Sequence, residues 1–304
     1  MLVKSRSITA GSLENEESAM FNLTSNSFSG AEASRLLVQF RDFMKHGGIL
    51  PSCSICLHSD ISEEVPPVQS LLKRIGSYDF YYHEGYYYIG YHYLRDSYAL
   101  LKADARFSIM DVYYKESGFV FNHSEIANPI YLAYRYRVLD FNSMMIHAAA
   151  VIYNGESILF CGPSGAGKST QADLWKEYLD AEILNYDKPC IIHDNQEWYV
   201  HGTPWSGKEG IYKNKCVPLK AIVFVEQNRD NQADRLSGSE AFSLIYLNNY
   251  LYPLNETVEL TSYAIISGIA KEVPVYRLKC DISKKAVQTL CRELYTNDCV
   301  MEEA

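Results

Sequence analysis

One nine-residue segment, residues 162–170, constrains this chain more than any other part of its sequence. It reads Gly-Pro-Ser-Gly-Ala-Gly-Lys-Ser-Thr and satisfies the phosphate-binding pattern G-x-x-x-x-G-K-[ST]. In this pattern the backbone N–H groups of a glycine-rich loop surround the phosphates, the lysine supplies a positive charge and the next hydroxyl binds Mg²⁺. We therefore expect a nucleotide site formed by Gly162, Pro163, Ser164, Gly165, Ala166, Gly167, Lys168, Ser169 and Thr170.

The segments on either side support this interpretation. Residues 157–161 are a short apolar run suited to a buried strand, and residues 170–179 have helical spacing. Ala172, Trp175 and Leu179 would share one face of that helix. A strand, a loop and a helix in this order predict an α/β fold, whereas a glycine-rich turn with an unrelated lysine would not require these flanks.

Charge and composition exclude several classes of partner. The net charge of the 304-residue chain is -9, which argues against a large nucleic-acid footprint or an anionic membrane surface. Hydrophobic residues make up 47% of the chain, yet no stretch approaches the roughly 20 apolar residues of a membrane span. The first residues lack the apolar core of a signal peptide. We therefore expect a cytoplasmic protein without a nucleic-acid or membrane partner.

The eight cysteines are scattered along the chain. Without an export signal, the simplest expectation is that all are reduced thiols. Cys53-Ser-Ile-Cys56 is the only CxxC in the sequence, and it has neither a second CxxC nor a histidine pair at zinc-finger spacing. We therefore predict no metal site there.

The composition divides the chain into an N-terminal α+β domain, residues 1–142, and a nucleotide-binding domain, residues 143–304. The first 30 residues are polar and predicted to be loosely held. Residues 31–44 carry an apolar helical face, and Asn128-Pro129 is predicted to open a helix that ends near residue 141. Nine of the 25 tyrosines lie within residues 77–98, where His83-Glu84-Gly85 reads as the turn of a hairpin.

The tyrosine cluster has two interpretations. Tyrosine is a good strand former with an amphipathic ring, so the cluster could simply build a small antiparallel sheet. It could instead display a surface for stacking or peptide recognition, where an acceptor would dock beside the phosphate loop.

The second domain is predicted to consist of strand–loop–helix units. A strand containing His147 is predicted over residues 145–153. Further strands are predicted over residues 181–186, 190–193, 198–201 and 221–226, and helices over residues 239–247, 257–271 and 283–295. Ser283 is the expected N-cap of the last helix.

Three motifs in this domain extend the pattern: His147-Ala-Ala-Ala, Asn185-Tyr-Asp187-Lys and Gly202-Thr-Pro-Trp-Ser-Gly-Lys-Glu-Gly. Their order around the phosphate loop resembles the catalytic domain of HPr serine kinase/phosphorylase, a relative of the phosphoenolpyruvate carboxykinase nucleotide core, over roughly residues 143–295. The resemblance implies a P-loop domain with a mixed sheet that binds ATP and Mg²⁺.

The resemblance also implies roles for single residues. His147 matches the family's active-site histidine near the metal and the transferred phosphoryl group. Asp187 matches the second member of an acidic pair that serves as metal ligand, with Ser169, and as general base. Tyr186 stands where the first acid would be, and a tyrosine with an ordinary pKa near 10 is a poor base at neutral pH.

Each assignment has a plain structural alternative. His147 could be a core histidine, and Asp187 could be a turn residue. Trp205 could serve core packing or a lid, while Lys208 and Arg277 could be solvated surface residues.

The predicted function is transfer of the ATP γ-phosphoryl group to a serine or threonine hydroxyl of a peptide or small protein. The alternative is a non-catalytic ATP-binding sensor or partner in a peptide-modification system, with Tyr186 marking lost catalysis. A carboxykinase-like reaction on a small acid is a third interpretation, but the sequence lacks an arginine-rich pocket for it. A homo-oligomer is compatible with all three.

Overall fold

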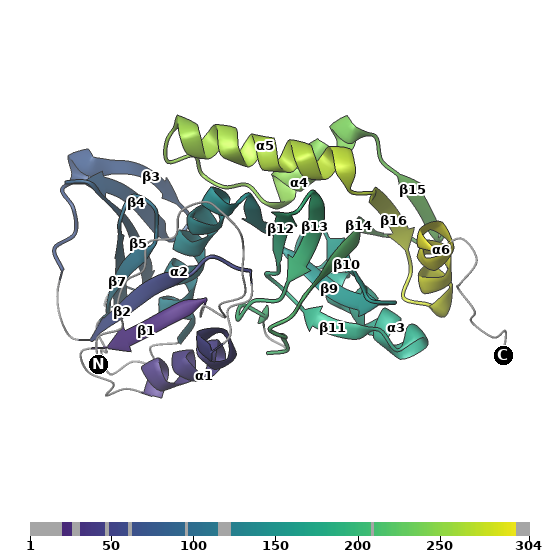
Figure 1. Ribbon diagram of the computed structural model, residues 1–304, viewed down its shortest axis with the longest axis horizontal. Helices are drawn as coiled ribbons and strands as arrows, with labels where there is room; N and C mark the ends of the chain where they lie inside the picture. The colour runs from purple at the N-terminus through teal and green to yellow at the C-terminus, as the bar shows by residue number, and fades with distance from the viewer. Residues whose placement is uncertain are drawn as a thin grey trace.

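The computed structural model describes residues 20–25, 31–45, 49–59, 63–94, 97–114, 123–207 and 210–295. Lys208 therefore lies outside the described residues. A seven-stranded sheet with helices α1 and α2 occupies the N-terminal part of the molecule, and a larger β structure with helices α3–α6 occupies the C-terminal part (Figure 1). The protein is a mixed α/β protein, as predicted.

The N-terminal sheet has the strand order β1-β2-β7-β6-β5-β4-β3. Strands β1, β2 and β7 run parallel, and β7, β6, β5, β4 and β3 run antiparallel to their neighbours. The strands span Phe21–Ser25, Cys53–Ser59, Leu71–Ile75, Tyr78–His83, Tyr86–Leu94, Ser97–Ala103 and Ile109–Tyr114 for β1 to β7. Residues 20–25 were expected to be loosely held, but β1 pairs with β2, and Met20 and Phe21 are fully buried in the N-terminal core.

The predicted hairpin is formed by β4 and β5. Glu84 and Gly85 have φ values of 49° and 85°, and two consecutive positive values match the twist of the flanking strands. Tyr81 and Tyr88 are buried on this sheet, whereas Tyr86 is exposed. The buried tyrosines therefore build the sheet, as the plainer of the two interpretations proposed, while Tyr82 and Tyr86 stay exposed on it.

Helices α1 (Ala31–Lys45) and α2 (His123–Arg137) cover one face of this sheet. Helix α1 matches its predicted range. Helix α2 begins before the predicted start, so that Pro129 lies inside the helix. The prediction placed proline at the first turn, where its missing N–H costs nothing, but burial of Ile126 and Ile130 stabilises the longer helix.

Trp205 belongs to the N-terminal core although its loop is C-terminal in sequence. Its indole is 5% exposed, packs against Phe21, Phe40 and Tyr134, and donates from Nε1 to the Ala127 carbonyl at 3.1 Å. Trp205 therefore serves packing rather than a lid. The N- and C-terminal parts share this core, so we expect a fragment of residues 143–304 to fold poorly.

The C-terminal β structure branches at one long strand, β14. One arm is antiparallel and has the order β14-β13-β12-β8. The other arm is mixed and has the order β11-β9-β10-β14-β16-β15. Strands β10, β14 and β16 run parallel, so their carboxyl ends meet at one edge. The bounds are Ser143–Met145, Ala148–Tyr153, Glu156–Cys161, Glu182–Asn185, Cys190–Asp194, Glu197–His201, Cys216–Gln227, Gln232–Arg235 and Val275–Cys280 for β8 to β16.

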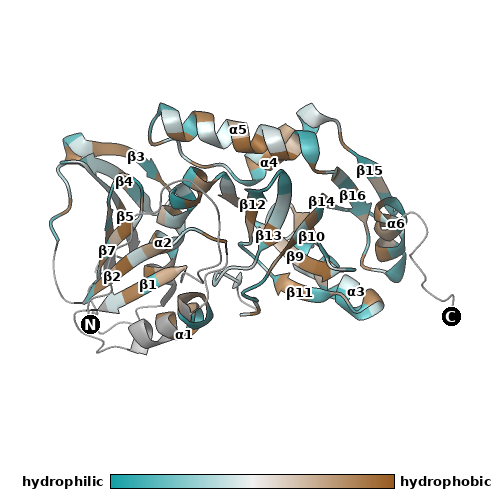
Figure 2. Cartoon of the chain, in the orientation of Figure 1, coloured by the Kyte–Doolittle hydropathy of each residue, from teal (hydrophilic) through white to brown (hydrophobic). Residues whose placement is uncertain are grey.

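Helices cover both faces of the mixed arm. Helices α3 (Lys168–Leu179) and α6 (Lys284–Leu294) pack on one face, and α4 (Gly238–Asn248) and α5 (Glu256–Glu272) pack on the other. Hydrophobic residues gather in the central strands between them (Figure 2). The chain before α5 also contacts the N-terminal sheet, where Asn255 donates to the Tyr87 hydroxyl at 2.9 Å.

Two local expectations were wrong, and a third was confirmed only in position. The strand predicted over residues 145–153 is two strands, β8 and β9, because they pair with different partners, β12 and β10. Ser283 takes the N-cap position of α6, but its hydroxyl donates to Asp281 and makes no cap bond. Cys291 is disulfide-bonded, whereas six other cysteines carry free thiols; the state of a cysteine depends on which thiols the tertiary structure brings together.

Gly202 provides a test of the fold around the site. A Cβ atom there would lie 1.9 Å from the Lys213 carbonyl oxygen, and backbone cannot move aside cheaply. We expect Gly202→Ala to lower the free energy of unfolding by about 1–3 kcal/mol. Gly238→Ala is the matched control, since its nearest neighbour would be 3.8 Å away. Thermal melts of both variants measure this, and equal melting temperatures would contradict it.

Candidate nucleotide-binding site

The loop of residues 162–167 joins the end of β10 to the start of α3. Gly162, Gly165 and Gly167 have φ values of 141°, 80° and 102°, which residues with a Cβ rarely adopt. A Cβ at Gly162 would also lie 3.1 Å from the Ala166 Cβ. The glycines therefore allow the sharp path of this loop, and the predicted strand, loop and helix all occur where expected.

Two side chains from other elements hold the loop. Gln227, at the end of β14, donates to the Gly165 carbonyl at 2.8 Å. Asn248, at the end of α4, accepts from the Gly162 N–H at 3.2 Å and donates to the His147 carbonyl at 3.0 Å. Asn248 thus ties the loop to the strand break that contains His147.

Lys168 is the first residue of α3, and its ammonium folds back over the loop. Its Nζ donates to the carbonyls of Gly162 and Pro163, both at 3.0 Å. Burial lowers the pKa of Lys168, and the nearby carboxylate of Asp187 opposes that shift. The helix N-terminus and this lysine together favour an anion. Ser169 follows in the first helical turn and is partly exposed.

His147, Asp187 and Lys188 form a charged cluster beside the loop. His147 lies in the two-residue break between β8 and β9, and Asp187 follows β11. Lys188 Nζ lies 3.1 Å from Asp187 Oδ1 and 3.0 Å from His147 Nδ1. His147 Nε2 lies 3.6 Å from Asp187 Oδ1. The structure therefore brings together His147 and Asp187, which are 40 residues apart in sequence.

The charge state of His147 follows from these neighbours. An ammonium can only donate, so His147 Nδ1 accepts from Lys188 and the ring proton lies on Nε2, toward Asp187. Burial, then Lys188, lowers the pKa of His147 to about 4, although Asp187 opposes the shift. His147 is thus neutral near pH 7.

This charge state is testable by NMR. The His147 imidazole should titrate near pH 4, and Lys188→Met should move its pKa back toward 6.5. Because the folded-state pKa is depressed, the stability contribution is present above about pH 6.5 and lost as pH falls toward 4. Lys220→Met removes a lysine paired with Glu156 and is the control. A wild-type midpoint near 6.5 would contradict the assignment.

Buried polar groups shape the turn that carries Asp187. Asn185 Oδ1 accepts from the backbone N–H groups of Asp187 and Lys188 at 2.8 and 2.9 Å. Asn185 Nδ2 donates to the Thr203 carbonyl at 2.8 Å, and the Thr203 hydroxyl donates to the Lys188 carbonyl at 2.6 Å. The Gly202-Thr-Pro-Trp motif therefore positions this turn as well as filling the core.

Tyr186 and Asp187 are adjacent in sequence, but their side chains lie in different surroundings. The ring of Tyr186 is buried among residues of α3 and α6, and its hydroxyl donates to Asp173 Oδ1 on α3. Arg277, by contrast, is a partly exposed residue of β16 that pairs with Glu226 at 2.9 Å. The surface interpretation of Arg277 therefore agrees with its position.

A cavity of about 320 Å³ opens beside the loop. It is lined by His147, residues 162–164, Phe224, Leu244, Leu247 and Asn248. Polar groups of the loop, His147 and Asn248 and the apolar side chains of Phe224, Leu244 and Leu247 therefore border the same space.

Sequence reasoning missed three residues of this site: Lys188, Asn248 and Gln227. Lys188 follows Asp187 directly, so its adjacency was a usable signal. Asn248 and Gln227 lie far from the motif in sequence and carry no local signal, because only the packing of α4 and β14 brings them to the loop.

The fold places this chain among mixed α/β proteins with a glycine-rich loop at the carboxyl edge of parallel strands. A family model described as "SynChlorMet cassette protein ScmC" matches residues 116–292, more than half of the chain, and the chain belongs to that family. No curated protein sequence matches this chain.

Among solved structures, the Hpr(Ser) kinase/phosphatase from Coxiella burnetii is a distant likeness. It is 9% identical, with a TM-score of 0.30, and the match covers 51% of this chain and 94% of that one. Separately, none of the helices in the described part of the chain is both long and apolar enough to span a membrane.

Proposed function

We propose that this protein binds ATP with Mg²⁺ and transfers the γ-phosphoryl group to a hydroxyl of a peptide or small protein. The observation that carries the proposal is geometric: Lys168 folds back over the glycine-rich loop, His147 lines the cavity beside that loop, and Asp187 lies 3.6 Å from His147. Phosphoryl transfer needs positioning and neutralisation of charge more than covalent participation by the protein. A loop of N–H groups, a cation and a carboxylate are the groups that supply this.

Each residue of the site would have a separate role in this reaction. The loop amides and Lys168 would hold the phosphates, with Lys168 exchanging its two carbonyl partners for phosphate oxygens. Ser169 and Asp187 would hold Mg²⁺, which neutralises phosphate charge. Lys188 pairs with Asp187 Oδ1, and Oδ2 would take the metal or the acceptor hydroxyl. His147 would act as a neutral Nε2–H donor rather than as a cation.

The cavity beside His147 suits the acceptor in this scheme. It borders residues 162–164 and has the apolar side chains of Phe224 and Leu244 in its lining. A side chain entering there would reach the loop from the side of His147. The exposed tyrosines of the N-terminal sheet remain a proposed docking surface for the rest of a peptide.

A second function is favoured by one specific observation, the environment of Tyr186. Its hydroxyl is bonded to Asp173 and its ring is buried, so it is poorly placed to act as a base. With a single acid at Asp187, the protein would bind ATP as a non-catalytic partner in a modification system. The family description, which names a cassette protein, is compatible with such a partner role.

Two measurements separate these functions. Calorimetric titration with ATP, with and without Mg²⁺, tests binding, and γ-labelled ATP with serine- and threonine-containing peptides tests transfer. Binding with transfer supports the kinase, and binding without transfer to any peptide or to water supports the partner. Absence of binding in the presence of Mg²⁺ would reject both.

A further inference from the structure

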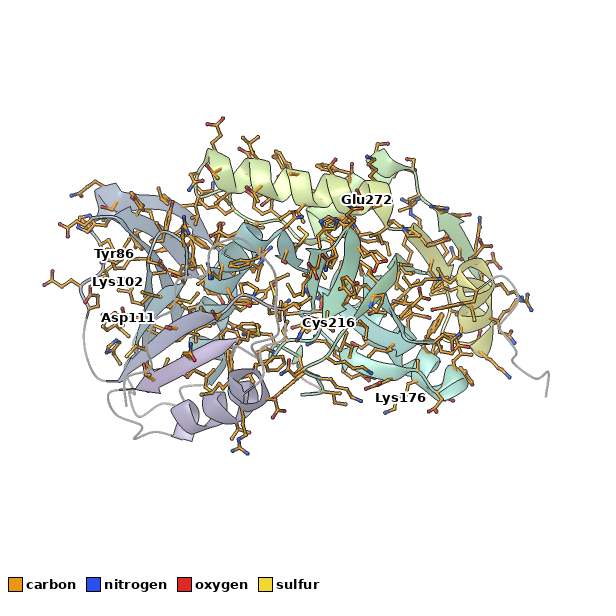
Figure 3. All side chains as sticks on the ribbon, in the orientation of Figure 1. Tyr86, Lys102, Asp111, Lys176, Cys216 and Glu272 are labelled. Carbon is orange, nitrogen blue, oxygen red and sulfur yellow. The ribbon has the colours of Figure 1, made fainter. Side chains whose placement is uncertain are left out.

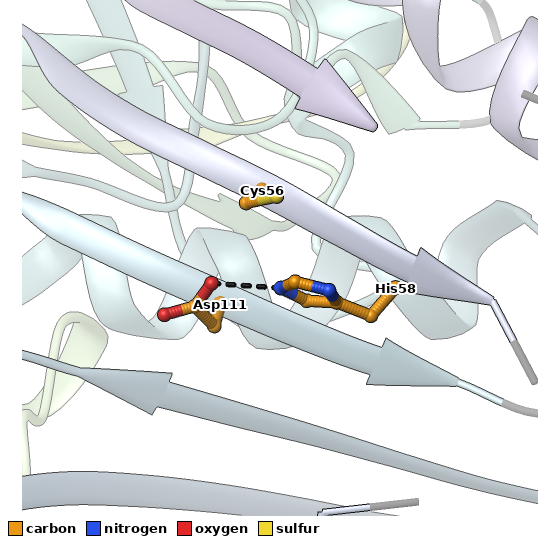
Figure 4. Close-up of side chains that lie close together, drawn as sticks. All are labelled: Cys56, His58 and Asp111. Carbon is orange, nitrogen blue, oxygen red and sulfur yellow. Dashed lines mark hydrogen bonds and ion pairs between the residues drawn. The ribbon is translucent and has the colours of Figure 1, made fainter. Parts of the chain in front are cut away.

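A second cluster of chemically reactive side chains lies on the N-terminal sheet, far along the chain from the phosphate loop. Cys56 and His58 belong to β2, and Asp111 belongs to the neighbouring parallel strand β7 (Figure 4). Cys56 and Asp111 are direct cross-strand partners, and His58 is two residues beyond Cys56. Side chains alternate along a strand, so all three project from the same face.

That face is the one opposite α1 and α2. Ile55 and Leu57, which alternate with Cys56 and His58, are fully or almost fully buried in the core beneath those helices. Cys53 shares their side, so the two thiols of the CxxC segment point to opposite faces of β2 and cannot bind one ion together. His58 and Asp111, rather than Cys53, lie near Cys56 on its face of the sheet.

The three donor atoms are already gathered. His58 Nε2 lies 2.8 Å from Asp111 Oδ1, and one donor atom from each of the three residues lies within 4.8 Å of the others. Zinc bonds of about 2.0–2.3 Å hold ligand atoms within about 4 Å of one another, so small side-chain rotations suffice. The His58 ring stacks on Tyr113 at 4.6 Å and 12°, which restricts its orientation.

We propose that Cys56, His58 and Asp111 form a Zn²⁺ site. A thiolate, an imidazole and a carboxylate suit Zn²⁺, whereas Mg²⁺ and Ca²⁺ prefer oxygen ligands alone. An ordinary hydrogen bond explains the pairing of His58 with Asp111 but not the thiol beside them. Three protein ligands leave one position of a tetrahedral ion for water or another small ligand.

The nearby charges are compatible with a cation. Lys102 is the cross-strand partner of Asp111 on β6. Its ammonium, however, is bonded to Glu63 at 2.8 Å and lies over the rings of Tyr86 and Tyr88 at 4.9 and 5.6 Å. Figure 3 shows Tyr86, Lys102 and Asp111 together on the N-terminal sheet. The positive charge of Lys102 is thus paired with the carboxylate of Glu63.

The test uses the full chain with the disulfide of Cys291 intact and the thiol of Cys56 free, and with excess Mg²⁺ to occupy oxygen-only sites. Competition for Zn²⁺ against a chromophoric chelator measures affinity, and Co²⁺ loading reports a thiolate ligand by its charge-transfer absorption. We expect one equivalent of Zn²⁺. Cys56→Ser should abolish the thiolate band. It should also weaken Zn²⁺ binding by more than about 10- to 100-fold, which is the usual effect of losing a residue that only hydrogen-bonds to a metal ligand.

Cys216→Ser is the matched control, since Cys216 is also partly exposed but lies in the other sheet (Figure 3). It should leave both readouts unchanged. Asp111→Asn keeps a hydrogen-bond acceptor for His58 and should weaken Zn²⁺ binding while retaining the thiolate band, which gives a reading even where Cys56→Ser fails to fold. No Zn²⁺ uptake by the wild type, or uptake that Asp111→Asn and Cys56→Ser leave unchanged, would overturn the proposal.

Discussion

Replacing Lys168 with alanine is expected to weaken ATP binding about 10- to 100-fold while leaving the fold intact. The ammonium would make charge-assisted hydrogen bonds to phosphate, each worth about 1.5–3 kcal/mol, and about 1.4 kcal/mol corresponds to a tenfold change in affinity. In the structure the ammonium donates to the carbonyls of Gly162 and Pro163, and Lys168, although buried, is not a member of the hydrophobic clusters, so the fold should survive its loss. Titration calorimetry with ATP and Mg²⁺ measures the affinity.

Lys176→Ala is the control for this experiment. Lys176 lies on the exposed side of α3, near its last turn (Figure 3). It should keep wild-type affinity. An affinity for ATP that is the same in the Lys168 and Lys176 variants would show that the loop is not a phosphate site, and the glycine-rich-turn interpretation would then hold.

Replacing Asp187 with asparagine is expected to lower the rate of phosphoryl transfer about 10²- to 10⁴-fold, the usual effect of losing a general base. The amide retains an oxygen that can accept from Lys188, so the cluster with His147 should survive. Binding of ATP should change much less than the rate. Single-turnover transfer from γ-labelled ATP measures the rate, and calorimetry measures the binding.

Asp194→Asn is the matched control for Asp187. Asp194 ends β12 and accepts from Asn195, away from the loop. If the Asp187 variant transfers phosphate as fast as this control, Asp187 is not the base. If the wild type and both aspartate variants bind ATP but none of the three transfers phosphate, the non-catalytic partner function is the correct one.

The sequence predicted the local elements of the site well because their causes are local. Glycines with positive φ, an apolar strand before them and a helical apolar stripe after them act over about 20 residues, and the structure has a strand, loop and helix there. The tyrosine hairpin was equally predictable, since Glu84-Gly85 meets the dihedral needs of a tight turn. Nucleotide binding itself stays a prediction.

Strand pairing was harder to predict because it depends on distant partners. Residues 145–153 were predicted to be one strand, but β8 and β9 separate where each pairs with a different neighbour, and His147 lies in the break. Trp205 likewise read as either packing or a lid. Its placement depends on Phe21, Phe40 and Tyr134, which the sequence separates from it by 70 residues or more.

The sequence alone therefore determined the phosphate-loop motif, the α/β class and the candidacy of His147, Lys168 and Asp187. Only the tertiary structure decided that Lys188 and Asn248 join them, and that Tyr186 turns to Asp173 instead. It alone also placed Cys56 beside Asp111. The physical reason is that backbone dihedrals and periodicity act between neighbours in the chain, whereas hydrogen bonds and ion pairs join whichever groups the packed sheets bring within a few ångströms.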